Sequence, residues 1–435
     1  MLWLYALPGL PLAALTLPVY VFVPSYYAEL GVPLALIGIA LLVVRLLDAV
    51  TDPAIGFLSD RLKLPFGRRK PWLVLGLVPT MLAVWMVFVP PEQPTVTYLL
   101  FWSALLSIGW TLMILPYTAW GAELAEDYDG RTGVTARREG LVVAGTLLAT
   151  ATPAVLDATG MGGTANAMQT LAISLMLLLP LTVAICVIFV PTPRNTTKRR
   201  INLREGITAL RDNRTFLRLI AAFLINGWAN GLPATLFVIF VTHVLAAPAL
   251  VGPLLFLYFV SGVVAIPGWL WIARRWNKHR TWVASMTLAC ATFVWVPFLG
   301  AGDVTAFAII CILSGFAVGA DLVLPAAIQA DVVDIDTAQT GEQRTGLYFA
   351  LWSLATKLSL ALAAGVAFPL LALAGFDATA NTPNTNQSLF AVSMLYAGLP
   401  VILKLPALVL MWSFPLDRDA HRELRARINS APASP

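Results

Sequence analysis

Charged residues are scarce in this sequence. Lys, Arg, Asp and Glu together account for 12% of the 435 residues, whereas soluble domains average about 25%. Hydrophobic residues account for 59%, and the mean hydropathy is +0.80. This composition excludes an ordinary soluble protein and indicates a chain that crosses a membrane several times.

Cysteine and histidine are scarce as well, with three residues of each. Cys186, Cys290 and Cys311 all lie in apolar runs. A thiol there behaves as a small buried hydrophobe, so we expect neither a disulfide nor a metal ligand. No His, Cys and acid cluster has metal-ligand spacing, and no Ser–His pair has an orienting acid nearby. The sequence therefore predicts no enzyme and no resident cofactor.

Long hydrophobic stretches, in contrast, are abundant. An apolar run of about 18 residues or more can span a bilayer as a helix. Twelve such runs occur, at residues 5–28, 35–58, 71–89, 96–122, 138–157, 168–190, 215–242, 249–273, 281–300, 304–330, 346–374 and 388–413. We therefore predict an all-α membrane protein with twelve transmembrane helices.

Basic residues are confined to alternate loops. The intervening loops contain no Lys or Arg, a split that places both termini in the cytoplasm of an inner or plasma membrane. The longest basic segment divides the spans six and six. The predicted domains are an N-terminal half at 1–190, a linker at 191–214, a C-terminal half at 215–413 and a cytoplasmic tail at 414–435.

The segment Arg45–Gly56 (RLLDAVTDPAIG) places ionisable residues inside an apolar run. Arg45, Asp48 and Asp52 are spaced i, i+3 and i+7, so they share one stripe of a helix. A charge at membrane depth costs at least ~2.5 kcal/mol, so this stripe should face a protein interior or a wet cavity. Pro53 removes one helical N–H and frees the carbonyl one turn earlier.

These groups suit a small cation. Two carboxylates, the nearby Thr51 hydroxyl and the freed carbonyl form a site for Na⁺ or a proton. The alternative is an internal salt bridge with Arg45 and no ligand. One arginine neutralises only one of the two acids, so the cation site is the favoured interpretation.

Several motifs resemble those of one transporter family. Gly56–Arg61 (GFLSDR) and Gly67–Lys70 (GRRK) are similar to the loop signature of the major facilitator superfamily. Together with Leu115–Leu124, Thr135–Gly145 and Ala330–Leu362, they resemble the melibiose permease-like glycoside–pentoside–hexuronide:cation symporters over nearly the whole chain. The resemblance implies the major facilitator fold, with two pseudo-symmetric six-helix halves around a midplane cavity that opens alternately to each side.

The resemblance also implies roles for individual residues. Asp48 and Asp52 take the place of the carboxylates that bind the coupling cation, and Thr111 takes the place of the hydroxyl that completes this site. Lys357 takes the place of the basic partner from the other half. Arg45 matches the arginine one turn before the acids.

Other positions depart from the family's sugar site. The acids that hold the sugar hydroxyls fall on Ala13 and Ile114, and the tryptophan that stacks on the sugar falls on Thr118. A site without these acceptors should not bind a sugar in the same way. The apolar first helix resembles the lysophospholipid-transporting branch more than the sugar branch. A sugar, a glycoside, an organic anion and an amphiphile all remain open as solutes.

Further polar side chains inside the spans are candidate solute contacts. Asp321 is expected either to replace the missing acceptors or to pair with a nearby amide. Asn226 and Asn230 share a helix face and either line the cavity or link helices. Arg138 either anchors an anionic group, as its family counterpart implies, or is a topology charge. Lys404 is expected to extend its amine to the inner membrane interface.

A last charged group lies at the loop after the second span, at Asp60, Arg61, Arg68 and Arg69. Such charges can bridge the second helix to its neighbours in one conformation and release it in another. We therefore expect a gating role for this loop and no direct contact with the solute.

The function predicted from these features is symport of a small organic solute with Na⁺ or H⁺, by a monomer in a lipid bilayer and with no nucleic-acid partner. Cation binding would remove the repulsion between Asp48 and Asp52 and free Lys357 or Arg45 to rearrange. The alternatives are a non-coupled facilitator, a scramblase-like protein or a lysolipid transporter on the same fold. A channel is disfavoured because the buried charges are few and confined to one constellation.

Overall fold

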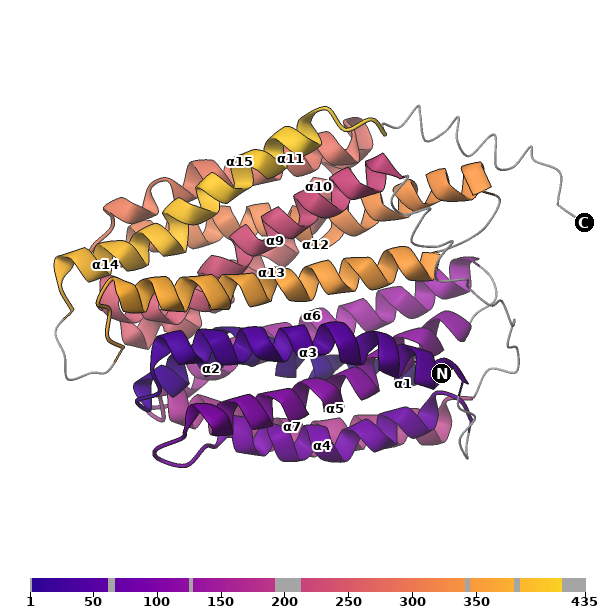
Figure 1. Ribbon diagram of the computed structural model, residues 1–435, viewed down its shortest axis with the longest axis horizontal. Coiled ribbons are helices and arrows are strands. Elements are labelled where there is room, and N and C mark those ends of the chain that lie inside the picture. Colours follow the sequence, from indigo (N-terminus) through magenta and orange to yellow (C-terminus); the bar gives the residue numbers. More distant parts are fainter. Residues whose placement is uncertain are drawn as a thin grey trace, which may run out of the picture. The chain divides into compact units, whose positions relative to one another are not determined.

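The computed structural model describes residues 2–61, 67–124, 128–191, 213–340, 345–378 and 384–416 (Figure 1). The helices of the first half are α1 (Leu2–Ala6), α2 (Gly9–Glu29), α3 (Leu34–Arg61), α4 (Lys70–Phe88), α5 (Val96–Glu123), α6 (Tyr128–Ala158) and α7 (Thr164–Phe189). Those of the second half are α9 (Arg214–Ile239), α10 (Val251–Arg275), α11 (Lys278–Phe293), α12 (Val304–Thr340), α13 (Thr345–Leu373), α14 (Asn386–Ser393) and α15 (Leu399–Trp412). A π-helical segment, Met394–Gly398, joins α14 to α15, and another, Phe240–Val244, extends α9.

Twelve helical segments in the described residues are long and apolar enough to cross a membrane, which confirms the predicted number of spans. The bounds agree as well. The predicted run 35–58 corresponds to the span Leu34–Gly56, and the predicted run 388–413 corresponds to Asn386–Trp412. The hydrophobic pattern alone therefore predicts where each span lies.

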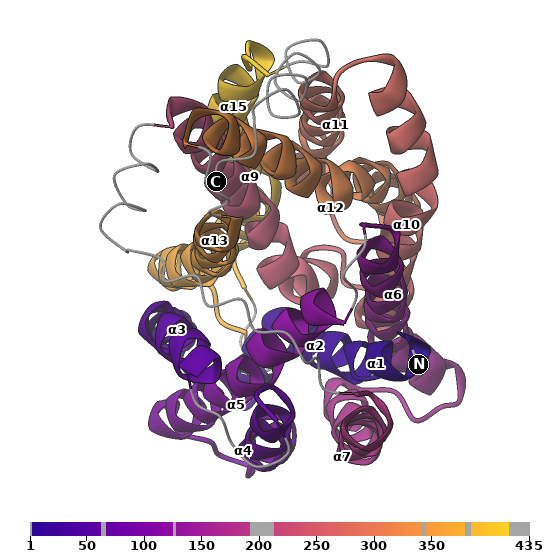
Figure 2. The ribbon, with the colours of Figure 1, turned by 90° about the vertical axis from the view of Figure 1, so that its right-hand side faces the viewer.

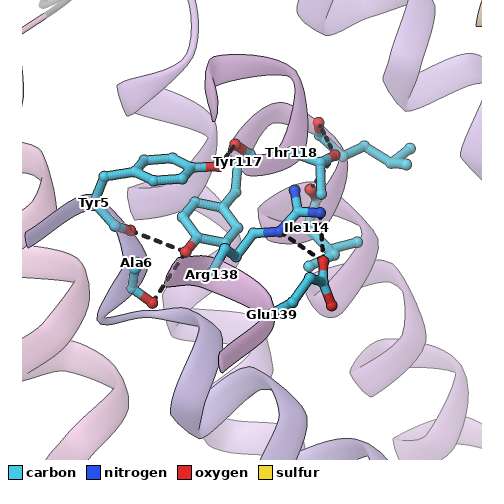
Figure 3. A network of polar contacts seen from close by, with 8 residues as sticks. Tyr5, Ala6, Ile114, Tyr117, Thr118, Arg138 and Glu139 are labelled. Carbon is cyan, nitrogen blue, oxygen red and sulfur yellow. Dashed lines mark hydrogen bonds and ion pairs between the residues drawn. The ribbon is translucent and has the colours of Figure 1, made fainter. Parts of the chain in front are cut away.

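The first span differs from its prediction, because it is a broken helix. The break between α1 and α2 leaves the last carbonyl groups of α1 without helical donors. The hydroxyl of Tyr117 on α5 donates to the carbonyl of Tyr5 at 2.9 Å and lies 3.2 Å from that of Ala6. In return, the Tyr5 hydroxyl donates to the Tyr117 carbonyl at 2.8 Å (Figure 3). These bonds attach the start of the chain to α5.

The chain divides into two compact units. Unit 1 comprises residues 1–197, 234–256 and 364–392, and unit 2 comprises residues 198–233, 257–363 and 393–435. The predicted linker at 191–214 and tail at 414–435 lie largely outside the described residues. The domain boundaries given in the sequence analysis therefore remain predictions.

Unit 1 positions the carboxylates of α3. In this unit α3 packs against α5, and α5 packs against α4, as the end-on view in Figure 2 shows. The α4–α5 contact is close because it is made by small residues. A Cβ at Gly109 would lie 2.8 Å from the backbone nitrogen of Thr80, so only glycine fits there. The tight packing holds α5 firmly beside α3.

Unit 2 has its own core. In this unit α11 packs against both α12 and α15. Trp282 of α11 is fully buried in a cluster that also contains Phe216 of α9, Leu324 of α12 and Met411 of α15. Four helices of the second half therefore meet around one tryptophan.

Candidate functional site

The α3 carboxylates lie near the middle of a transmembrane helix. Asp48 follows Leu34, the first residue of α3, by 14 positions, which is roughly 20 Å along a helix. Its side chain is fully buried, and that of Asp52 is half-buried. Both acids therefore lie at a depth where a charge must be balanced by the protein or by a ligand.

Asp48 is bound on both oxygens. Arg45 donates from Nη1 to Oδ2 at 2.8 Å, and the Ser107 hydroxyl of α5 donates to Oδ1. The guanidinium of Arg45 also lies over the ring of Tyr20 of α2, 4.8 Å from its centroid. This is the internal salt bridge that the sequence left open as an alternative, and it is made with Asp48.

Asp52 has a neutral partner on α5. The hydroxyl of Thr111 donates to its Oδ1 at 2.9 Å, and Thr111 is fully buried. Arg45 is the only base of α3 before its last residue, and α5 has none. Arg45 is therefore the base that the central part of α3 and the whole of α5 offer to the two acids.

The hydroxyls of α5 form a stripe that faces both acids. Ser107 and Thr111 are spaced i, i+4, so they share one helix face, and each donates to a different α3 carboxylate. Ser107 was not among the predicted site residues. Its spacing of four from Thr111 was the signal that identifies it. The Thr51 hydroxyl is buried as well and has no hydrogen-bond partner among the described residues.

Lys357 belongs to unit 2. Lys357 lies on α13 and is only 8% exposed. A buried ammonium on a transmembrane helix requires compensation. Its pairing with the α3 carboxylates remains a prediction.

Unit 2 contains a second buried polar cluster. The sequence predicted a polar role for Asp321, Asn226 and Asn230, but not for Lys404 or Trp282. Asp321 of α12 accepts hydrogen bonds from the side-chain amides of Asn226 at 3.1 Å and Asn230 at 2.8 Å, and from Trp282 Nε1. Lys404 of α15 donates to the amide oxygens of the same two asparagines, at 2.6 and 2.7 Å. The expectation that Lys404 extends to the membrane interface is wrong, because its residue is only 5% exposed and its ammonium is bound inside the helix bundle.

Figure 3 shows Arg138 of α6 together with Ile114 and Thr118 of α5, two of the positions at which the family's sugar contacts fall. Arg138 is paired with Glu139, with Nη2 and Oε1 2.6 Å apart. The Thr118 hydroxyl donates to the carbonyl of Ile114 on its own helix at 2.9 Å. Ile114 therefore lacks the acid, and Thr118 lacks the stacking tryptophan, that the resemblance implies for the family's sugar site.

The predicted gating loop is described in part. Asp60 and Arg61 end α3, and their side chains lie outside the described residues. Arg69 is buried, with Nη1 3.3 Å from the Ser59 hydroxyl and 3.4 Å from its carbonyl, whereas Arg68 is half-buried. The gating role of all four residues remains a prediction.

The sequence matches the model of one protein family and is similar to several symporters. The model of the family described as MFS/sugar transport protein matches residues 4–418. Sodium-dependent lysophosphatidylcholine symporter 1-A of Danio rerio is 24% identical over 421 residues, covering 88% of this chain and 79% of that protein. Its Homo sapiens counterpart, symporter 1, is 25% identical over 424 residues, covering 89% and 77%. The inner membrane symporter YicJ of Escherichia coli is 25% identical over 405 residues, covering 88% and 84%.

Comparison with solved structures supports the fold. The nucleoside transporter NupG matches with a TM-score of 0.67 at 12% identity, covering 95% of this chain and 98% of that one. A bacterial homologue of the human lysosomal transporter Spinster matches with a TM-score of 0.66 at 12% identity, covering 98% and 96%. At such identities the likeness shows the shared arrangement of helices and nothing about the solute.

Proposed function

The chain belongs to the MFS/sugar transport protein family, and from this premise we propose that it moves a small organic solute together with Na⁺. The relatives named as sodium-dependent symporters support the ion. Their named solute, lysophosphatidylcholine, and the absence of the family's sugar acids at Ala13 and Ile114 support an amphiphile ahead of a sugar. Lysophosphatidylcholine is therefore the first solute to test.

The arrangement of Asp48, Asp52, Ser107 and Thr111 is the observation that carries this proposal. Two carboxylates and two hydroxyls from α3 and α5 lie at membrane depth, and oxygens of these kinds are the ligands that a hard cation prefers. Arg45 already balances Asp48. A bound ion would therefore act chiefly on Asp52, with Thr111 and the buried hydroxyl of Thr51 as neutral oxygen ligands.

Coupling follows from the charge balance. An uncompensated carboxylate resists transfer into a closed, dry conformation, and a bound cation removes that cost. If the solute also favours the closed conformation, the ion and the solute raise each other's affinity by the same factor. Symport then needs no direct contact between them.

Ligand stabilisation of the purified protein tests this proposal. The melting temperature should rise in NaCl relative to KCl, and lysophosphatidylcholine should raise it further in NaCl than in KCl, because both bind the folded state. Asp52→Asn should abolish the Na⁺ effect. Glu92→Gln, which removes an exposed acid in a loop, is the matched control and should keep it.

The Arg45–Asp48 pair favours a second candidate, a non-coupled facilitator in which the charges only hold α3 in place. Uptake into proteoliposomes separates the two. A facilitator would equilibrate lysophosphatidylcholine without accumulating it under any Na⁺ or H⁺ gradient. Gradient-driven accumulation that survives in Asp52→Asn would reject the proposed cation site, and a response to pH in place of Na⁺ would make H⁺ the coupling ion.

A further inference from the structure

The polar cluster of unit 2 is a charge pair separated by two amides. Lys404 donates to the oxygens of Asn226 and Asn230, and the nitrogens of the same two amides donate to Asp321. An ammonium only donates and a carboxylate only accepts. The amides therefore have one orientation that satisfies both neighbours, with their oxygens toward Lys404 and their N–H groups toward Asp321.

The cluster is closed at one end and accessible at the other. Lys404, Asn226 and Trp282 are 5%, 2% and 0% exposed, whereas Asp321 and Asn230 are half-buried. A network that served only to hold helices together would be expected to have its charges sealed on every side. Here the ammonium is sealed and the carboxylate is not.

The two oxygens of Asp321 also differ, in the number of hydrogen bonds that each accepts. Oδ1 accepts from both Asn226 and Trp282, whereas Oδ2 accepts only from Asn230 among the described residues. A carboxylate oxygen can accept two hydrogen bonds. Oδ2 therefore has capacity for one more donor, and Asn230, its present partner, lies at the accessible end of the cluster.

We propose that Asp321 Oδ2 accepts a hydrogen bond from a hydroxyl group of the transported solute, with Lys404, Asn226, Asn230 and Trp282 as the residues that position it. This inference rests on the proposed transport function and names the chemistry that the solute must carry. The pair of Lys404 and Asp321 is neutral overall, so an uncharged donor leaves the buried site neutral, whereas a cationic donor would add a charge at membrane depth. A sugar hydroxyl and the free glycerol hydroxyl of a lysophospholipid both meet this requirement.

Matched pairs of probes test for this hydroxyl and distinguish its two sources. The first pair is lysophosphatidylcholine and its 2-deoxy analogue, and the second is octyl glucoside and an octyl tetrahydropyranyl ether. Binding is measured on the full-length protein in lipid nanodiscs. A buried acceptor left without its donor discriminates strongly, so we expect the wild type to prefer the hydroxyl-bearing member of one pair by about tenfold or more. The pair that shows the preference identifies the source.

Substitutions in the cluster test whether the preference for a hydroxyl arises at Asp321. Asp321→Leu should bring the ratio of the two affinities to about one, because leucine offers the hydroxyl neither an acceptor nor a donor. Lys404→Met should reduce it as well, although Lys404 touches no solute, because the amide oxygens of Asn226 and Asn230 then lose the donor that holds them and Asp321 loses its compensating charge. Lys404→Arg keeps the cation and should retain part of the preference. Trp282→Phe removes one donor from Oδ1 and should have a smaller effect on the same ratio.

The dependence on Na⁺ separates this inference from the function on which it rests. If the wild type shows no stabilisation by Na⁺, the coupling proposal is wrong whatever the probes do. If the Na⁺ effect is present but neither pair shows a preference, or the preference survives in Asp321→Leu, the inference about Asp321 is overturned. Trp282→Phe leaves both Lys404 and Asp321 in place, so it provides a second test if Lys404→Met does not fold.

Discussion

The two buried charge clusters differ in how they are balanced. In unit 1, Arg45 on the same helix donates to Asp48. Neutral hydroxyls of α5 donate to both Asp48 and Asp52. In unit 2, Asp321 and Lys404 balance one another through two amides. In unit 1 two acids of α3 share its helix with one base, Arg45, whereas in unit 2 one acid faces one base.

This difference separates two uses of buried charge. A cluster whose acids outnumber the base on their own helix is suited to bind an ion and changes when the ion leaves. A neutral cluster with oriented amides keeps one geometry and is suited to fixed recognition. The same residue type, an aspartate at membrane depth, therefore serves two purposes that depend on its partners.

The largest expected effect separates the two acids of α3. Asp48 is fully buried, and Asp48→Ala removes the partner of the half-buried Arg45; breaking such a pair costs about 3–5 kcal/mol of stability. Asp52→Ala should cost less stability, because the Thr111 hydroxyl loses an acceptor whereas Arg45 would lose its partner charge, and it should abolish the Na⁺ effect. Unfolding in mixed micelles measures both variants, and equal losses would remove the distinction between them.

The neutral pair of unit 2 predicts non-additive losses. Lys404→Met and Asp321→Leu should each cost about 3 kcal/mol because each leaves one buried charge uncompensated, whereas the double variant should recover much of that loss. The same unfolding assay supplies the complete double-mutant cycle. Simple additivity would mean that the two charges are not coupled through Asn226 and Asn230.

A smaller effect tests the hydroxyl of Thr111. Thr111→Val keeps the shape of the side chain and removes the donor to Asp52, so it should weaken Na⁺ binding by about tenfold. Thr111→Ser should retain most of the affinity. The midpoint of the NaCl-dependent rise in melting temperature reports both, and an unchanged midpoint in Thr111→Val would remove Thr111 from the ion site.

The smallest effect belongs to Ser107. Its hydroxyl donates to an acid that Arg45 already balances, so Ser107→Ala should cost about 1 kcal/mol of stability and shift the Na⁺ midpoint less than Thr111→Val does. A larger shift of the midpoint than in Thr111→Val would place the ion beside Asp48.

Most of the fold could be predicted from the sequence, because each transmembrane helix is a local property of its own hydrophobic run. The stripe of Arg45, Asp48 and Asp52 followed from helical periodicity for the same reason. The break in the first span was not predicted, since it depends on Tyr117, more than 100 residues away in the sequence.

The cluster of unit 2 shows that contacts between different helices could be predicted only in part. The spacing of Asn226 and Asn230 correctly indicated a shared face, and pairing of Asp321 with an amide was one of the two expectations. Lys404 was assigned to the membrane interface because its distance from a helix end allows that, and no local pattern reveals two asparagines on α9. Trp282 was missed for a related reason, because an indole donor is recognisable only beside its acceptor.

The bonds between Tyr117 and the first turn of the chain have a practical consequence. Tyr117 lies six residues beyond Thr111 on α5, roughly 9 Å along the same rigid helix. A lengthwise shift of α5 caused by an ion at Thr111 would pull on α1, where Trp3 is 59% exposed. A fluorophore at position 3 would therefore serve as an optical gauge of ion occupancy, read from outside the bundle and without any knowledge of the solute.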